Sequence, residues 1–272
     1  MMRRVIVRVV IVVLAILAVG IIAFPQYAVP VLRWVVQAVP PATPPPPTIS
    51  APHGELPAGA VGLTEYAQTH DSDAQKLAGS GFVLRLPSGE IIGVTTAHSL
   101  FDVYPEGTLR TVGLGPNGQS APLIETDTYY GPPGVPLTGD DVSVDYVLLK
   151  LTNPDPAYAL DPDPRGAPQP GERVTLYSGL GDGQGGPFGW EGTVFTVGDH
   201  AVFVLMDAGV SDPSGMSGSP VVSQYTGKVV GMAMAVIVAS RQRWLVGIHP
   251  IRHIVQLAQD AKVFPRIEDF RH

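Results

Sequence analysis

One serine stands in a stretch whose composition suits covalent chemistry. The run Gly-Met-Ser-Gly-Ser-Pro occupies residues 215–220, with Ser217 near its centre and two valines directly after it. Glycine on both sides lets the backbone take a sharp, strained turn, so that a hydroxyl projects while neighbouring N–H groups converge beside it. Ser217 is therefore a candidate nucleophile for acyl transfer.

A serine hydroxyl is a weak nucleophile at neutral pH, so it needs a base and a group that orients the base. His98 ends the run Val-Thr-Thr-Ala-His, and Asp145 opens the run Asp-Tyr-Val-Leu-Leu-Lys-Leu. Asp140 and Asp141 compete for the orienting role, but Asp145 directly precedes the continuous apolar strand. His98 alone would be an ordinary turn histidine, whereas the three motifs in the order His, Asp, Ser favour catalysis.

These motifs resemble those of the chymotrypsin-like (trypsin-fold) serine peptidases, which read roughly Thr-Ala-Ala/Gly-His, Asp-x-Ala-Leu-Leu-x-Leu and Gly-x-Ser-Gly-Ser/Gly-Pro. The resemblance spans about residues 78–258. It implies that His98 is the general base, that Asp145 fixes the imidazole tautomer and that Ser217 attacks the peptide carbonyl. It also implies an oxyanion hole made by the backbone N–H groups of Gly215 and Ser217, with no cofactor required.

The same resemblance suggests where specificity is determined. Ser211 and Asp212 fall where the base of the family's primary pocket lies, and Met234 and Val236 fall on the strand that lines the cleft. A small or basic residue before the cut is expected, which cleavage of a peptide library checks. Met216 departs from many trypsins, which have an aspartate there that binds a freshly cut N-terminus, so that activation route is not expected.

Composition predicts an all-β body. Hydrophobic residues make up 45% of the 272 residues, enough for a core, and the 31 glycines and 28 prolines argue for many turns and against a helical bundle. From about residue 59, short apolar stretches alternate with turns, and residues 250–258 have apolar positions at helical spacing. With this pattern, the resemblance implies two antiparallel six-stranded β-barrels (chymotrypsin-like) with a C-terminal helix, and we expect an N-terminal transmembrane helix before them. Strands are expected within residues 81–86, 91–96, 111–114, 171–179, 192–197, 201–205 and 228–236.

The N-terminus has the pattern of a signal anchor. Residues 1–24 carry three early arginines and then a long uncharged apolar run, long enough to span a bilayer with its N-terminus in the cytoplasm. The alternative is a cleaved signal peptide, with a small-x-small site at residues 18–20, which would leave a secreted protein. The ten prolines of residues 25–58 predict an extended linker, with polyproline II at residues 44–47.

The expected domain organisation follows from these boundaries. It comprises a signal anchor or transmembrane helix at 1–24, a Pro-rich linker at 25–58, a trypsin-like serine protease domain at 59–260 (barrel 1 at 59–152, barrel 2 at 170–248, C-terminal helix at 250–260) and a tail at 261–272.

Charge and cysteine content exclude several classes of function. The net charge is −7, and after the three early arginines 14 basic face 24 acidic side chains, so nucleic acid is not an expected partner. The absence of cysteine excludes disulfides, thiolate metal sites and cysteine catalysis, and makes the chain more similar to prokaryotic members of the family. His249 and His253 are four residues apart, but Pro250 lies between them and no third ligand is evident, so no metal site is expected.

The sequence therefore predicts a serine endopeptidase anchored in the cell membrane by its N-terminal helix, with an extracytoplasmic protease domain and protein or peptide substrates. The alternative from another class is a catalytically inactive or ligand-gated protease-fold protein that acts as a binding or scaffold module. An esterase with an α/β-hydrolase fold is disfavoured, because that fold has the chain order Ser, Asp, His and alternates strands with long helices.

Overall fold

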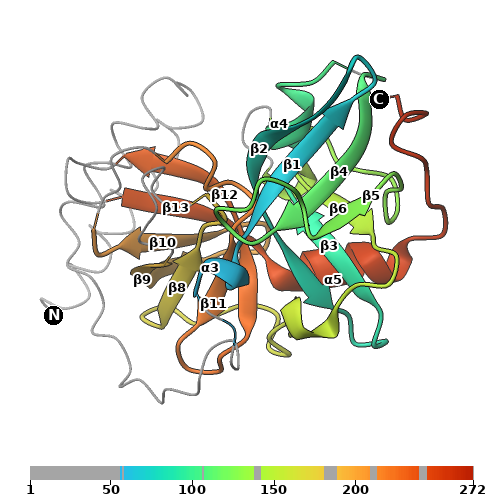
Figure 1. The fold of residues 1–272 in the computed structure, drawn as a ribbon. Helices are drawn as coiled ribbons and strands as arrows, with labels where there is room; N and C mark the ends of the chain where they lie inside the picture. Colours follow the sequence, from blue (N-terminus) through green and yellow to red (C-terminus); the bar gives the residue numbers. More distant parts are fainter. Residues whose placement is uncertain are drawn as a thin grey trace, which may run out of the picture.

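The computed structural model describes residues 56, 58–105, 107–137, 142–180, 189–208, 213–238 and 244–271. The predicted membrane helix at 1–24 and the linker up to residue 55 lie outside this part of the chain. Within it, no helix has the length and apolar character needed to cross a membrane. Figure 1 shows two β-rich halves, one built from the strands β1 to β6 and the other from the strands β8 to β13.

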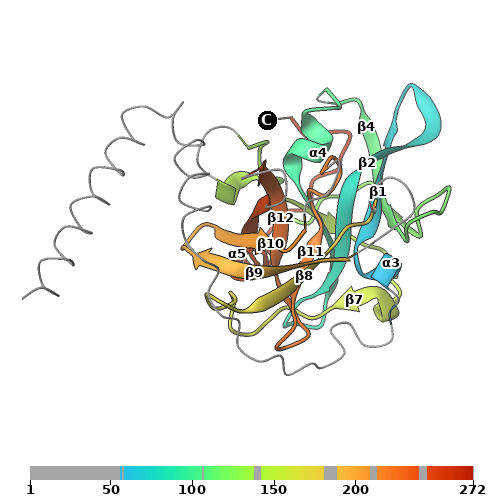
Figure 2. The ribbon, with the colours of Figure 1, turned by 90° about the vertical axis from the view of Figure 1, so that its left-hand side faces the viewer.

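The first half is a seven-stranded sheet in the order β5-β4-β1-β2-β3-β6, with the short β7 paired in parallel to β2. The β1–β2 hairpin is long, and Figure 2 shows its tip standing out from the rest of this half. The strands are β1 (Leu63–Thr69), β2 (Ser72–Arg85), β3 (Ile91–Thr95), β4 (Leu109–Gly115), β5 (Ile124–Thr126), β6 (Val147–Lys150) and β7 (Ala159–Leu160).

This half differs from the closed six-stranded barrel that the sequence analysis expected. The two ends of the sheet meet through a single bridge between Tyr129 and Leu149 and through backbone hydrogen bonds beside it. The strand β5 has only three residues, and the chain soon reaches Gly131 and two prolines. Proline has no N–H to donate to a ladder, so regular pairing is interrupted after this bridge, and hydrogen bonds to residues 144–146 resume only at Gly134 and Val135.

The second half confirms the expected six-stranded barrel. Its strands close in the order β10-β13-β12-β11-β8-β9, all antiparallel. The interior holds mostly branched apolar side chains, which suit a pleated, closed surface. The strands are β8 (Arg173–Tyr177), β9 (Gly189–Val197), β10 (Val202–Met206), β11 (Pro220–Ser223), β12 (Val229–Val238) and β13 (Trp244–Pro250).

The predicted C-terminal helix is present as α5 (Ile251–Asp260), and it joins the two halves. Its buried residues Ile251, Ile254 and Ala258 belong to one apolar cluster that also includes Phe82 of β2 and Met232 of β12. The two halves therefore share a hydrophobic core. The other helices are short: α3 (Ala58–Val61), α4 (Ala97–Phe101), η2 (Val142–Val144) and η3 (Pro156–Tyr158).

Residues 261–271, which the sequence analysis left as a tail, pack on the first half. The N–H of Tyr129 donates to the Pro265 carbonyl (2.9 Å), and the N–H of Ile267 donates to the Asp127 carbonyl (2.8 Å). The Ile267 side chain is buried, and Phe270 meets Tyr129 edge to face. The last residues of the chain thus cover the place where the first sheet fails to close.

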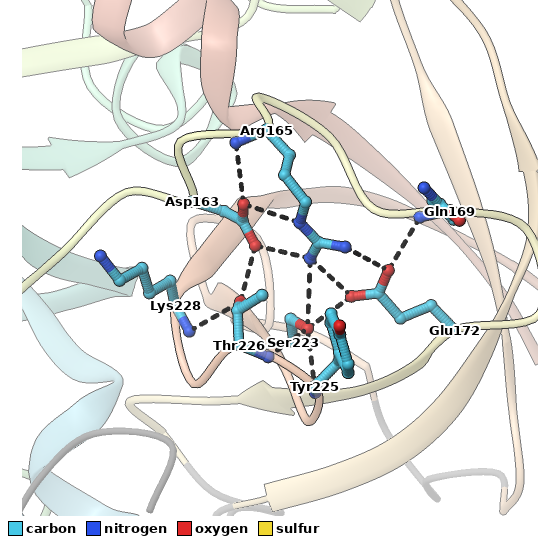
Figure 3. A network of polar contacts seen from close by, with 8 residues as sticks. All are labelled: Asp163, Arg165, Gln169, Glu172, Ser223, Tyr225, Thr226 and Lys228. Carbon is cyan, nitrogen blue, oxygen red and sulfur yellow. Dashed lines mark hydrogen bonds and ion pairs between the residues drawn. The ribbon is translucent and has the colours of Figure 1, made fainter. Parts of the chain in front are cut away.

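The connection between the halves is fastened to the second barrel by a polar network (Figure 3). The Arg165 guanidinium donates to Asp163 (2.6 Å) and to Glu172 (2.9 Å), whose side chains are almost fully buried. From the β11–β12 turn, the Thr226 hydroxyl donates to Asp163 (2.6 Å) and the Ser223 hydroxyl donates to Glu172. Because each buried carboxylate has several donors, the connection takes one fixed path over the barrel.

Candidate active site

Strand pairing brings His98 and Asp145 together. His98 lies in α4, which begins two residues after β3 ends, and Asp145 stands two residues before β6 begins. The strands β3 and β6 are antiparallel neighbours in which Thr95 faces Val147. The residue that follows one strand and the residue that precedes the other must therefore lie side by side.

The buried Asp145 carboxylate receives three hydrogen bonds from the segment that carries His98. Its Oδ1 accepts from the N–H groups of Ala97 (2.7 Å) and His98 (3.0 Å), and its Oδ2 lies 2.6 Å from His98 Nδ1. Because a carboxylate only accepts, the ring donates from Nδ1 and presents Nε2 as the acceptor. Burial opposes the charged imidazolium, but the hydrogen bond and charge of Asp145 outweigh it, so the pKa of His98 is raised. This pair has the geometry of a base and its orienting group.

The turn of residues 215–218 comes from the second half but is held by β2 of the first. Gly215 and Gly218 both have positive φ angles, 81° and 87°. The Ser80 hydroxyl donates to the Gly215 carbonyl (2.6 Å), and the Ser80 N–H donates to the Ser217 carbonyl (3.1 Å). A Cβ on Gly218 would lie 1.8 Å from the Ser80 carbonyl oxygen, so this close contact requires glycine.

Ser217 lies at the same junction as the helix of His98, but its hydroxyl is engaged elsewhere. The hydroxyl donates to the Met234 carbonyl (3.0 Å), and no hydrogen bond joins it to His98 within the described chain. The two segments meet at Gly79: a Cβ there would lie 3.1 Å from Cβ of Ser99 and 3.5 Å from the Ser217 carbonyl oxygen. The structure thus bonds two of the three predicted site residues and places the third in the neighbouring turn.

The backbone around Ser217 presents two N–H groups that have no hydrogen-bond partner in the described part of the chain. The N–H of Met216 donates to the Pro213 carbonyl (3.1 Å), and the N–H of Gly218 donates to the Ala233 carbonyl (2.8 Å). The N–H groups of Gly215 and Ser217 donate to none of the residues that the structure describes. These are the two donors predicted for an oxyanion hole.

Comparison with known proteins settles the family. A sequence model described as the trypsin-like peptidase domain matches residues 79–232, which is more than half of the chain. The chain belongs to this family. The resemblance seen in the sequence is therefore confirmed. No curated protein matches the chain.

Three solved structures are similar to the trypsin-like peptidase. A serine endoprotease from Yersinia pestis has 16% identity and a TM-score of 0.48, over 74% of this chain and 64% of that one. The HtrA-type protease AlgW with a decapeptide has 13% identity and a TM-score of 0.50, again over 74% and 64%. A protease from M. tuberculosis in its active form has 16% identity and a TM-score of 0.49, over 83% and 91%. The chain spans less than two thirds of the first two structures, and at such identity the AlgW likeness shows the fold alone.

The predicted pocket of the trypsin-like peptidase is only partly described. Ser211 and Asp212 lie outside the described residues, and so does the side chain of Val236. Met234 is described: its side chain is buried in the core that joins the two halves, and its carbonyl accepts from Ser217. Met216 is buried in the second barrel, so an apolar residue fills the place of the aspartate of many trypsins.

The predicted non-ligand histidines pack behind the Asp145 segment. His249 is fully buried, its Nε2 lies 3.0 Å from the Ser143 carbonyl oxygen, and its ring centre is 5.5 Å from that of His253. The described residues contain no group of three side chains suited to a metal ion. His249 thus contacts the chain just before Asp145.

Sequence reasoning missed two polar residues of this trypsin-like peptidase that lie close to the site. Ser80 bonds the serine turn and also accepts from the N–H of Gly179 (2.9 Å), a contact between residues far apart in sequence. Glu65 of β1 is fully buried, and neither of its carboxyl oxygens has a hydrogen-bond partner among the described residues. A single acid within the run Leu-Thr-Glu-Tyr-Ala gave a usable signal, because an acid inside a strand of the first half must either face solvent or serve a purpose.

Proposed function

We propose that this trypsin-like peptidase hydrolyses peptide bonds through a triad of Ser217, His98 and Asp145, on the outer side of the membrane that its N-terminus anchors it to. One observation carries the catalytic part: a fully buried carboxylate bonded to Nδ1 of an imidazole that is partly exposed. That arrangement stabilises the imidazolium that forms when a base removes a proton.

The reaction proceeds in two stages, acylation and deacylation. The Ser217 hydroxyl leaves the Met234 carbonyl, gives its proton to Nε2 of His98 and forms a bond to the peptide carbonyl carbon, whose π electrons move to oxygen. When the tetrahedral intermediate collapses, the C–N bond breaks and His98 gives the proton to the leaving amine. Water then repeats the sequence, losing a proton to His98 and releasing the acid and the free serine.

The oxyanion of that intermediate needs donors that are already in place. The N–H groups of Gly215 and Ser217, without partners among the described residues, support this role. Losing one such donor costs on the order of 3 kcal/mol of transition-state stabilisation. Ser80 supports the arrangement, because its hydroxyl holds the Gly215 carbonyl on the side of the first half.

The triad predicts selective labelling of the purified full-length chain by a fluorophosphonate. We expect one adduct by intact mass in wild type, none in Ser217→Ala, and at least a hundredfold slower labelling in His98→Ala, because an unassisted hydroxyl is a poor nucleophile. Ser219→Ala is the matched control, since it removes from the same turn a buried hydroxyl that bonds none of the described residues, and it leaves the triad intact.

One observation favours a second candidate, the ligand-gated protein. The Ser217 hydroxyl bonds Met234 rather than His98, so the triad is not fully connected here. In that case, wild type stays unlabelled until a peptide ligand is added. Absence of labelling in folded wild type, with or without peptides, would reject the triad and leave the scaffold function.

The membrane location has its own test. Residues 1–24 are the proposed anchor, so the full chain should stay with membranes after an alkaline wash, and a protease added outside intact cells should digest the domain. Deletion of residues 1–24 should keep the domain inside the cell. A wild-type chain found wholly in the medium would instead indicate signal cleavage.

A further inference from the structure

Glu65 is a buried acid without an obvious structural role. It lies in β1, whose seven residues are all buried, and both of its oxygens lack hydrogen-bond partners in the described chain. Burying an ionised carboxylate without partners costs several kcal/mol, so such groups are rare unless something retains them. The position of the Glu65 carboxyl suggests a function for this buried acid.

The Glu65 carboxyl lies where the segments of the active site converge. Glu65 pairs with Gly79 across the β1–β2 hairpin. A Cβ on Gly79 would lie 3.0 Å from Oε2 of Glu65, 3.1 Å from Cβ of Ser99 and 3.5 Å from the Ser217 carbonyl oxygen. Gly79 thus leaves room for the carboxyl beside the residue that follows His98 and beside the serine turn.

The nearest hydroxyls suit a protonated carboxyl better than an ionised one. The Thr95 hydroxyl donates to the Ser80 carbonyl (2.9 Å), and the Ser99 hydroxyl donates to the Thr96 carbonyl (2.9 Å). Their hydrogens are therefore used, while their oxygens can still accept a proton from a neutral acid. Burial raises the pKa of Glu65 to about 8, and the charge of His98 acts in the opposite direction.

His98 is the one basic group that faces Glu65 from the elements packed around it. The other facing groups are the phenols of Tyr104 and Tyr129, whose pKa values are raised by burial and then by Glu65. The serine turn contributes no titratable side chain. On the flanking strands β2 and β4, the charged residues Asp73, Lys76 and Arg110 are exposed to solvent, and Arg85, at the far end of β2, pairs with Asp161. The charges of Asp145 and Asp102 raise the pKa of His98 itself.

We propose that Glu65 is a positioning residue of the active site, a neutral acid that on ionisation places a second negative charge near His98 and makes the imidazole a stronger base. This inference rests on the proposed triad. It assigns Glu65 no contact with substrate, because its effect passes through His98. The negative charge stabilises the imidazolium that forms while Ser217 attacks, so acylation accelerates when Glu65 loses its proton.

The rate of fluorophosphonate labelling from about pH 5 to about pH 10 tests this in the full-length chain. Wild type should show two rises, one as His98 loses its proton and a second near pH 8, of about three- to tenfold, as a charge that shifts a neighbour by about one pKa unit would give. Glu65→Gln should match wild type near pH 6, where Glu65 is neutral, and lack the second rise.

The control is Glu90→Gln, which removes a carboxyl at the opposite end of the β2–β3 hairpin, where Glu90 bonds Tyr130. Its profile should follow wild type. A purely structural role for Glu65 would lower the rate of the glutamine variant equally at every pH and would overturn the proposal, as would a variant that keeps both rises. A wild type that labels at no pH would overturn the proposed triad and this inference with it.

Wild type alone offers a second measurement that does not depend on the folding of a variant. The infrared band of the buried protonated carboxyl should vanish over the same pH range in which the second rise occurs. If the band vanishes in a different range, the second rise belongs to another group and the proposal fails.

Discussion

At the scale of single residues, two buried carboxyls near one histidine differ in their hydrogen-bond donors. Asp145 accepts three hydrogen bonds, whereas Glu65, equally buried, accepts none from the described residues. Only Asp145 belongs to a recognisable sequence motif, because it lies just before a strand, whereas Glu65 lies inside one.

The raised pKa of Glu65 predicts how the stability of the fold changes with pH. Its pKa rises from 4.5 to about 8 on folding, so between these values the native state holds a proton that the unfolded state has lost. The free energy of unfolding should therefore fall as pH increases from about 4.5 to about 8 and then level off. The size should be a few kcal/mol, since each pKa unit represents roughly 1.4 kcal/mol.

Denaturant titrations of wild type and Glu65→Gln at several pH values would measure this. The difference between the two proteins isolates Glu65 from all other groups, and the glutamine variant should gain relative stability toward alkaline pH. Parallel curves across the range would show that Glu65 keeps its ordinary pKa.

At the scale of elements, the candidate active site forms where the strand β2 contacts the serine turn. The strand β2 supplies Ser80, which holds the serine turn, and β3 and β6 supply the neighbours of His98 and Asp145. The helix α4 needs only five residues, because the three bonds to Asp145 hold its first turn. The short helix α4 is thus held in place by Asp145 rather than by its own length.

The contact between turn and strand predicts a sharp effect of Gly218→Ala. The new Cβ would lie 1.8 Å from the Ser80 carbonyl oxygen at a φ of 87°, so the turn must move away from β2. We expect a loss of at least 1–3 kcal/mol in stability, from backbone strain alone, and a loss of labelling at Ser217 of tenfold or more.

Gly118→Ala separates strain from contact. Gly118 has a similar φ, 81°, but nothing lies within 4 Å of its Cβ position, so this variant carries the strain without the collision. It should lose about 1 kcal/mol and label at the wild-type rate. If the two variants labelled alike, the closeness of the turn to β2 would not matter for the serine.

The sequence predicted what depends on local patterns and missed what depends on distant contacts. The closed second barrel could be predicted from the family resemblance that the three motifs carry, and α5 could be predicted because its apolar periodicity is regular. The open first sheet could not, since closure depends on a few backbone groups after β5. Likewise, nothing near Glu65 in sequence shows that α4 and the serine turn will cover it, and nothing near Ser217 shows that its hydroxyl will meet Met234.

At the scale of the whole molecule, the two halves are joined by one apolar cluster, by α5 and by the serine turn. The C-terminal residues then close over the gap in the first sheet, so the last part of the chain completes the first part. The proposed triad lies at this junction, with the proposed base and its carboxylate on the first half and the proposed nucleophile on the second.

The path of the connection shows where the chain divides between the halves. The strand β7, ending at Leu160, pairs with β2, whereas Pro162 pairs with Val229 and the Arg165 network ties the following residues to the second barrel. The chain therefore passes from the first half to the second at Asp161. Related peptidases could exchange their second halves, in evolution or in the laboratory. The Arg165 network would stay intact only if the crossover were placed at Asp161, because the connection would then come from the same parent as the barrel that holds it.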